Sequence, residues 1–315
     1  LNAQQRGLEF HPDLTQLLRD NAPLVDDEFI HDAENHETFL EILNQRGNVA
    51  PAMRAMHEID LLGRYIPEFG RMTCLVQHEF FHAYAADEHT LVCLEKLDQI
   101  WDADKPPFAH YTHILQDIDL PYLLYLALFL HDAGKGMESG DHVRDGMVVC
   151  QKVGARLGLN ARRLARLNFL VENHLLMAEV SQRRDIDSPT VIHQFAKTVQ
   201  DEENLAMLTL LTFADSLGTS DNLWNDFKNT LLKTLYHLAG RRLRQVVNKV
   251  YPLRRFEVSK VVPHVLLEGG FRRLRSLSQN YEGVRRLAPF CVRHTHNSHF
   301  LHSGMTQQAT FDLDR

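Results

Sequence analysis

The spacing of apolar residues restricts this chain to a helical fold. Across most of residues 1–240, apolar side chains recur every three or four positions, and few segments show the two-residue alternation of a strand. In residues 90–101, TLVCLEKLDQIW, the side chains of Leu91, Leu94 and Leu97 share one helical face. Residues 203–217 are apolar on nearly every side, as expected of a helix inside a bundle. The pattern therefore predicts an all-α fold.

Composition divides the chain into three predicted regions. Residues 1–72 are expected to form a short helical linker region, in which Gly47 ends a helix. Residues 73–240 are expected to form a helical bundle. Residues 241–315 form a basic tail that is poorly patterned, and its arginines, including Arg241 and Arg254, are interpreted as a solvated face.

The bulk properties argue against several classes of protein. The net charge of −7 argues against a general nucleic-acid binder, because such proteins normally carry an excess of basic residues. The four cysteines lie far apart without a CxxC pair, which is typical of reduced thiols in a cytosolic protein. The longest apolar run, residues 120–130, is too short to cross a bilayer. We therefore expect a cytoplasmic protein whose partners include neither nucleic acid nor a membrane.

The segment LALFLHDAGKGMESGDH, residues 126–142, places His131 and Asp132 side by side at the end of an apolar stretch. Imidazole nitrogens and carboxylate oxygens are ligands for divalent metals, and at the last turn of a helix both can converge on one atom. The alternative is an ordinary helix end, where His131 interacts favourably with the helix dipole and Asp132 begins a turn. The pair alone leaves both interpretations open.

Other polar residues in apolar surroundings favour a metal site. His89 lies near the start of a predicted helix, and His142 follows the glycine-rich loop. His174 and Asp215 each lie inside an apolar segment that is predicted to be helical. A buried carboxylate such as Asp215 is costly unless it is paired or bound to a metal, whereas His89 and His174 could be ordinary core or surface histidines. Because bundles build metal sites from facing helices, we expect these side chains to converge.

The order of these residues resembles the HD superfamily of metal-dependent phosphohydrolases, an all-helical family named for its adjacent His-Asp pair. The phrase HDAGKG, residues 131–136, resembles its central motif, with Lys135 at the usual lysine position. Longer stretches of residues 30–240, such as VENHLLMAEVSQRRDIDSPTVIHQFAKTV and LTLLTFADSLGTSDNLWNDFKNTLL, resemble the bifunctional PII uridylyltransferase/uridylyl-removing enzymes of bacterial nitrogen control. The resemblance implies an HD-domain helical bundle that hydrolyses the uridylyl group from a tyrosine of the PII signalling protein.

The resemblance also implies roles for individual residues. It implies a divalent cofactor, with two ions of Mn, Fe, Co, Zn or Mg. The implied ligands are His89, His131, Asp132 and Asp215 for the first ion, and His142 and His174 for the second. Asp132 and Lys135 are the implied catalytic residues: Asp132 bridges the ions and Lys135 stabilises phosphoryl oxygens. His82 and Arg144 are interpreted as substrate-binding residues, although Lys135 and Arg144 could equally be solvated side chains.

Two parts of the family pattern are missing from the sequence. No Gly-Ser followed by paired aspartates, expected of the uridylyltransferase domain, is present in residues 1–72, and residues 241–315 do not resemble two glutamine-sensing ACT domains. The chain is therefore interpreted as a fragment or as a stand-alone relative. Two other functions stay open, namely an HD phosphohydrolase acting on a free nucleotide and a catalytically inactive HD regulatory module. Since every candidate ligand position holds a metal-competent side chain, we favour an enzyme.

Overall fold

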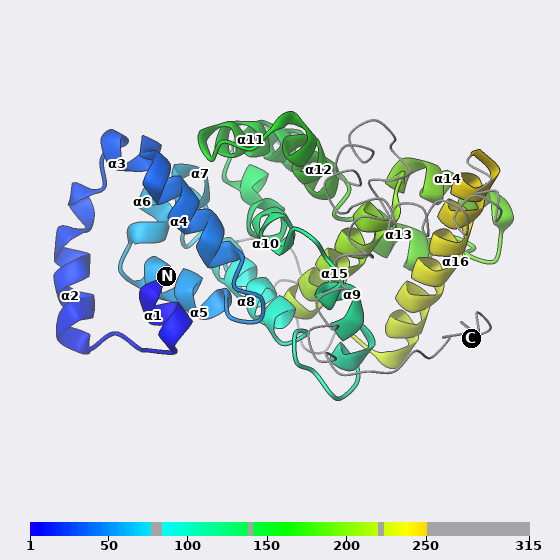
Figure 1. Cartoon of the computed structure of the whole chain (residues 1–315), viewed down its shortest axis with the longest axis horizontal. Helices are drawn as coiled ribbons and strands as arrows, with labels where there is room; N and C mark the ends of the chain where they lie inside the picture. The colour runs from blue at the N-terminus through cyan, green and yellow to red at the C-terminus, as the bar shows by residue number, and fades with distance from the viewer. Residues whose placement is uncertain (77–83, 138–140, 220–223, 251–315) are drawn as a thin grey trace, which may run out of the picture. The chain divides into compact units, whose positions relative to one another are not determined.

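Helix α10, residues Pro121–Leu130, is the central element of the fold. The computed structural model describes residues 1–76, 84–137, 141–219 and 224–250. Every side chain of α10 is buried, because a helix that is apolar on all sides is stable only when other elements surround it. The helices that pack against α10 are α4 (Ala33–Leu43), α8 (Ala86–Asp98), α11 (His142–Arg156), α12 (Ala161–Glu172) and α15 (Glu202–Thr219) (Figure 1).

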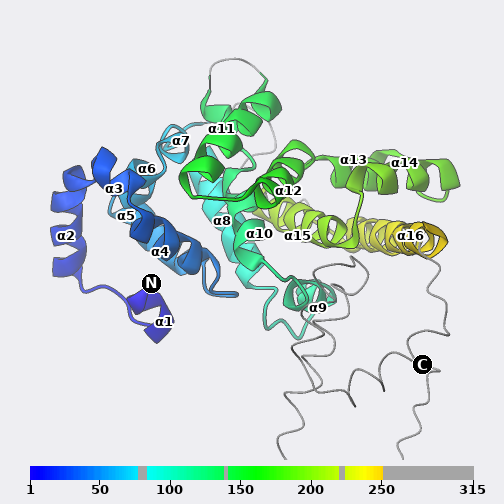
Figure 2. The ribbon, with the colours of Figure 1, turned by 45° about the horizontal axis from the view of Figure 1, so that its top comes forward.

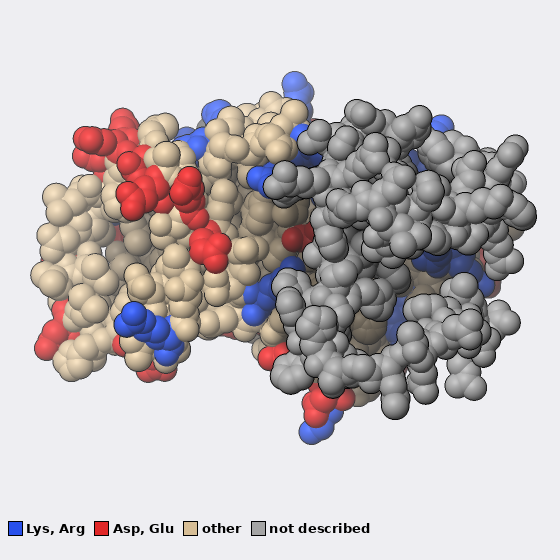
Figure 3. Space-filling view, in the orientation of Figure 1, with Lys and Arg blue, Asp and Glu red and all other residues tan. Residues whose placement is uncertain are grey.

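Short helices make up the described residues before α8. In addition to α4 they are α1 (Asn2–Arg6), α2 (Pro12–Asn21), the 3-10 helix η1 (Ala22–Leu24), α3 (Asp27–His31), α5 (Ala50–Glu58), α6 (Leu61–Tyr65) and α7 (Pro67–Gly70). Asp26 and Asp32 begin α3 and α4, since their side chains accept hydrogen bonds from backbone amides of the first turn. Acidic side chains gather over α3 and α4 in the space-filling view (Figure 3).

The remaining described elements follow α8. They are η2 (Phe108–His110), α9 (Thr112–Gln116), η3 (Ala133–Gly136), α13 (Leu176–Arg183), α14 (Pro189–Val199) and α16 (Asp226–Val250). Helix α14 lies beside α16, where Arg242 Nη2 donates to His193 Nδ1 over 3.0 Å (Figure 2). Helix α16 continues past residue 240, where the change in composition predicts a boundary.

The all-α prediction is confirmed, since no residue of the described ranges lies in a strand. Residues Leu1–Val246 form one compact unit. Among the described helices, none combines the length and the hydropathy that a bilayer crossing requires.

One helix ends earlier than the sequence predicts. The pattern of residues 162–177 predicts a helix that includes His174, but α12 ends at Glu172. The side chain of Asn173 donates from Nδ2 to the carbonyl of Phe169 over 2.9 Å, which offers the backbone an alternative to continued helix. His174 therefore lies in the turn between α12 and α13.

Candidate metal centre

His131 occupies the C-terminal end of α10, and its ring is almost completely buried. Its Nδ1 donates to the carbonyl of Leu128 over 2.7 Å, so the lone pair of the neutral ring belongs to Nε2. Among the described residues, Nε2 has no hydrogen-bond partner with acceptable geometry, although two carboxylates lie near it. A buried nitrogen that presents a lone pair to acidic groups has the orientation expected of a metal ligand.

Helices α8 and α15 bring His89 and Asp215 to the same point. The first turn of α8 carries His89, and its Nε2 lies 3.1 Å from Oδ1 of Asp215 on α15. The same Oδ1 lies 3.5 Å from Nε2 of His131. One carboxylate oxygen is thus shared by two imidazoles from different helices, as the sequence-based expectation of convergence requires.

Asp132 and Lys135 lie against the same imidazoles. Oδ2 of Asp132 is 3.4 Å from Nε2 of His131 and 3.7 Å from Nε2 of His89. The Nζ of Lys135 lies 2.8 Å from the same oxygen, because η3 turns the chain back immediately after the helix end. The side chain of Lys135 is 18% exposed and that of Asp132 is 5% exposed, so the lysine stands on the solvent side of the carboxylate.

His174 neighbours His131, and His142 neighbours His174. The Nδ1 of His174 donates to the carbonyl of Val171 over 2.7 Å, which leaves the lone pair on Nε2 as in His131. Its ring centroid lies 5.5 Å from that of His131 and 6.3 Å from that of His142, the first residue of α11. The ring centroids of His89 and His131 lie 5.4 Å apart, so each of the four imidazoles neighbours another one, and the two carboxylates lie near His89 and His131.

Charges within the cluster are strongly coupled. Burial opposes a proton on His131, but the carboxylates of Asp132 and Asp215 raise the pKa of its ring to about 10. Burial likewise opposes ionisation of Asp215, yet the imidazoles of His131 and His89 lower the pKa of this carboxyl well below its ordinary value. Burial and the nearby His131 lower the pKa of His174. The two carboxylates are thus stabilised by nearby positive charge, which either protons on the imidazoles or a bound cation can supply. The set of imidazole and carboxylate donors fits a divalent metal.

Cys93 was not identified as a candidate from the sequence. It lies one turn after His89 on α8, and its Sγ is 3.6 Å from Nε2 and 3.7 Å from Nδ1 of that histidine. Candidate ligand atoms of His89, Cys93, His131 and Asp215 all lie within 4.8 Å of one another. Burial raises the pKa of the Cys93 thiol, and His89 opposes that shift. The i, i+4 spacing of His89 and Cys93 is the sequence signal that would have revealed it.

One of the two predicted substrate-binding residues, Arg144, lies in the described part of the chain. Arg144 is exposed on α11, and its backbone amide donates to the side chain of Asp141, which caps the helix. His82 lies outside the described residues. The roles of both residues in substrate binding stay predictions.

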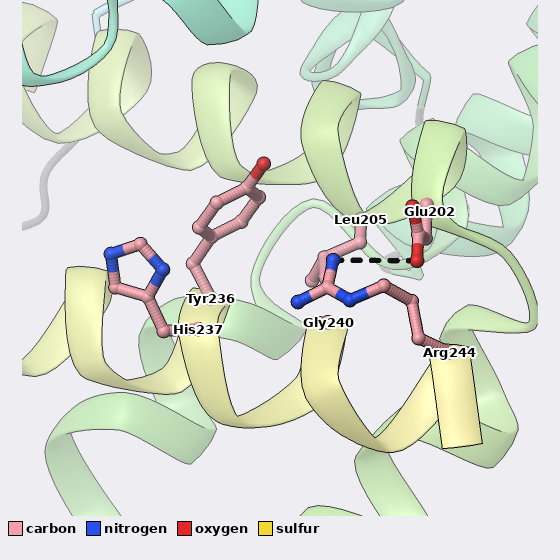
Figure 4. Close-up of a pocket in the computed structure, with 6 residues that line it drawn as sticks. All are labelled: Glu202, Leu205, Tyr236, His237, Gly240 and Arg244. Atoms are coloured by element: carbon pink, nitrogen blue, oxygen red, sulfur yellow. Dashed lines mark hydrogen bonds and ion pairs between the residues drawn. The ribbon is translucent and has the colours of Figure 1, made fainter. Parts of the chain in front are cut away.

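A separate hollow lies between α15 and α16. Figure 4 shows that it is crossed by a contact of 3.4 Å between Arg244 Nη1 and Glu202 Oε1. Its lining residues are Glu202, Leu205, Tyr236, His237, Gly240 and Arg244. None of the predicted metal ligands belongs to it, so the candidate centre is a buried cluster and not this surface feature.

Comparisons with known proteins identify relatives of the chain. Residues 1–65 match the family model described as "Uridylyltransferase GlnD third domain". A protein of Cereibacter sphaeroides named "Bifunctional uridylyltransferase/uridylyl-removing enzyme" is 38% identical over 237 residues, which are 74% of this chain and 25% of the relative. A protein of the same name from Ectopseudomonas mendocina is 37% identical over 265 residues, 82% of this chain and 29% of the relative.

These alignments confirm the resemblance drawn from the motifs. The chain spans little more than a quarter of the length of the curated relatives it matches. The central part of this chain contains the HDAGKG motif and the helices that bring His89, His131 and Asp215 together. The chain is a homologue of one segment of the bifunctional uridylyltransferase/uridylyl-removing enzymes.

Proposed function

We propose that this chain is a metal-dependent phosphodiester hydrolase that removes UMP from a uridylylated PII-type signalling protein. The observation that carries the proposal is the buried Nε2 of His131, which lacks a hydrogen-bond partner among the described residues and lies between two carboxylates. The names of the relatives include a uridylyl-removing activity, which supports removal of UMP over hydrolysis of other phosphodiesters.

The cluster would hold the metal through residues that the structure already orients. His89, His131, Asp132 and Asp215 would be ligands of one divalent ion, and His174 and His142 would be ligands of a second. When bound, such ions supply an activated water at neutral pH and neutralise charge on phosphate oxygens. The backbone carbonyls of Leu128 and Val171 hold two of the imidazoles in the required tautomer.

The side chains around Asp132 would orient the substrate. Lys135 is held 2.8 Å from Asp132 and is partly exposed, so its ammonium group can approach a phosphoryl oxygen that arrives from solvent. Asp215, with 17% of its side chain exposed, also reaches this side of the cluster. The imidazoles of His89 and His131 behind these residues are almost completely buried.

A hydrolysis assay tests the proposal directly. The purified full chain, supplied with Mn²⁺, Co²⁺ or Zn²⁺, is incubated with a uridylylated PII-type protein, and released UMP is measured. We expect release that a chelator abolishes and that Asp132→Ala reduces by at least about a hundredfold. The matched control is Asp119→Ala, which removes an exposed carboxylate outside the cluster and should leave the rate unchanged.

Two other results would contradict the proposal. Hydrolysis of free nucleotides, with the uridylylated protein untouched, would favour a nucleotide phosphohydrolase. Binding of the PII-type protein without any UMP release by the metal-loaded chain would favour an inactive regulatory module.

A further inference from the structure

We propose that a hollow beside α6 and α7 is a nucleoside subsite, in which the guanidinium group of Arg71 stacks on the pyrimidine base of a uridylyl group. The inference rests on the proposed function, because it gives a place to the part of that substrate that carries no phosphate. The hollow, called here the α6–α7 hollow, contains none of the proposed metal ligands.

The α6–α7 hollow is large enough for a nucleoside. Its volume is about 380 Å³, which lies in the usual range of small-molecule sites. A Cβ added at Gly70 would lie 2.6 Å from the carbonyl oxygen of Gly63, so glycine lets the backbones of α6 and α7 approach each other here. The lining includes these two glycines and four residues with polar side chains, which are Asp60, Arg64, Arg71 and Thr73.

Arg71 joins this hollow to the turn that carries Lys135. A Cβ added at Gly136 would lie 3.0 Å from the Cβ of Arg71, so the arginine lies directly against η3. Its Nη1 donates to Sδ of Met137, the residue that follows η3, over 3.1 Å. Lys135 belongs to the same short turn, and its Nζ lies 2.8 Å from Oδ2 of Asp132. The hollow therefore borders the turn that reaches the metal cluster.

The guanidinium group of Arg71 is available to a ligand. The side chain is exposed, and within the described part of the chain it forms no ion pair and contacts only a thioether sulfur through its donors. The Nε of Arg64, by contrast, lies 2.7 Å from Oδ2 of Asp60. A planar guanidinium group stacks well on a nucleic-acid base. A solvated surface arginine is the competing explanation.

The other polar groups suit a nucleoside better than a second anion. Asp60 brings a negative charge into the hollow and offsets the charge of Arg64, and its carboxylate can accept a hydrogen bond from a ribose hydroxyl. The Oγ1 of Thr73 would lie 3.9 Å from a Cβ at Gly63, so this hydroxyl lies on the glycine side of the hollow. It can donate to or accept from the edge of a base.

Ligand binding tests the subsite without requiring turnover. The affinities of UMP and of inorganic phosphate for the full chain, supplied with Mn²⁺, are measured by isothermal titration calorimetry. We expect UMP to bind about tenfold more tightly than phosphate, because contact between the base and the guanidinium group adds to the contacts of the phosphate. Arg71→Ala keeps the Cβ that lies against η3, and it should remove most of this advantage while leaving the affinity for phosphate unchanged.

Two further variants separate stacking from charge. Arg162→Ala removes an exposed arginine at the start of α12 and should bind both ligands as the unmodified chain does. Arg71→Lys keeps the positive charge but loses the planar group, so it should recover only part of the affinity for UMP. Full recovery in Arg71→Lys would overturn stacking as the contact.

The outcomes also distinguish the subsite from the proposed function. Equal affinities for UMP and phosphate, binding of neither ligand, or UMP binding that Arg71→Ala leaves unchanged would each overturn the subsite. If Arg71→Ala raised KM for a uridylylated PII-type protein without changing the affinity for UMP, Arg71 would contact the protein substrate instead. Binding of UMP that depends on Arg71, in a chain that releases no UMP from that protein, would support the subsite and contradict the proposed reaction.

Discussion

At the scale of single residues, backbone carbonyls determine what the imidazoles can do. Leu128 and Val171 each accept a hydrogen bond of 2.7 Å from the Nδ1 of a histidine three residues later, so both rings present Nε2 to the cluster. The same local geometry is therefore built twice, once at the end of α10 and once after α12. It prepares His131 and His174 for a cation before any cation binds.

Gly134 controls how closely η3 approaches the start of α11. A Cβ at this position would lie 1.9 Å from the carbonyl oxygen of His142 and 2.5 Å from the backbone nitrogen of Gly146. We expect Gly134→Ala to push η3 and the start of α11 apart and to lower the free energy of unfolding by about 1–3 kcal/mol. We also expect it to reduce the occupancy of a metal ion bound by His142 and His174. Chemical denaturation and metal content measure the two effects.

The matched control for this prediction is Gly240→Ala on α16. The nearest atoms to its new Cβ would lie 3.5 Å away, and alanine is the better helix former. A Gly134→Ala chain as stable as the Gly240→Ala chain would show that the close approach at η3 is unimportant.

Part of the site could be predicted from residue types alone. Asp215 is identifiable because a carboxylate on an apolar helix needs a partner, and His131 and Asp132 stand out at the end of the most apolar segment. The tautomers depend on carbonyl positions, which no residue pattern specifies. Cys93 was missed because a buried cysteine on a helix usually packs as a small apolar side chain.

At the scale of helices, an ion pair joins α7 to α11. Arg156 donates from Nη1 and Nη2 to the two carboxylate oxygens of Glu68 over 3.3 and 2.7 Å, and each side chain is 13% exposed. Burial opposes ionisation of Glu68, but Arg156 outweighs that effect and lowers the pKa of the carboxyl. The pair thus ties the N-terminal helices to the helix that begins with His142.

The lowered pKa makes part of the stability depend on pH. Above the ordinary glutamate pKa both the folded and the unfolded chain carry the charge, and the pair contributes fully. As the pH falls below that value the unfolded chain takes up the proton first, so the contribution is lost as the pH approaches the folded-state pKa. We expect Glu68→Gln to cost about 2 kcal/mol at neutral pH and progressively less in acid, measured by urea denaturation at several pH values.

An exposed pair provides the comparison. Arg184 and Glu179 lie 3.1 Å apart, but their side chains are 61% and 48% exposed. Glu179→Gln should therefore change stability by less than about 1 kcal/mol. Equal losses of stability in Glu68→Gln and Glu179→Gln would contradict the role assigned to the largely buried pair of Glu68 and Arg156.

Helix ends were less predictable than helices. The apolar spacing of residues 162–177 continues through His174, yet Asn173 diverts the backbone by bonding to Phe169. The change in charge near residue 240 predicts a domain boundary and not a helix end, and α16 continues past it with Leu243 buried. A change in composition reflects the charge of exposed side chains, whereas the length of a helix depends on the apolar side chains of its buried face.

At the scale of the whole molecule, α10 supports both the core and the cluster. Its residues pack against five helices, and its last turn leads directly into His131 and Asp132. The all-α fold could be predicted because the apolar period is helical almost throughout the described part of the chain. The helices that surround α10 could not be predicted, because periodicity identifies the buried face of a helix but not the element that packs against that face.

Because α10 belongs to the core and leads into the cluster, we expect the stability of the core and metal binding by the cluster to depend on each other. Leu126 in the middle of α10 is fully buried, and Leu126→Ala should cost about 2–5 kcal/mol. Thermal unfolding monitored by circular dichroism should show the lower midpoint, and bound metal should be released in the same transition. Leu17→Ala, at a residue 58% exposed on α2, should change stability by less than about 0.5 kcal/mol.

Metal content tests the central claim most directly. The purified full chain is incubated with Mn²⁺, Fe²⁺, Co²⁺, Zn²⁺ and Mg²⁺ in turn, freed of unbound ion, and assayed by elemental analysis beside Asp132→Ala and Asp119→Ala. A two-metal hydrolase predicts about two equivalents of at least one ion, retained in Asp119→Ala and reduced in Asp132→Ala. A chain that retains none of these ions would contradict the account, because packing alone would then explain the buried histidines and carboxylates.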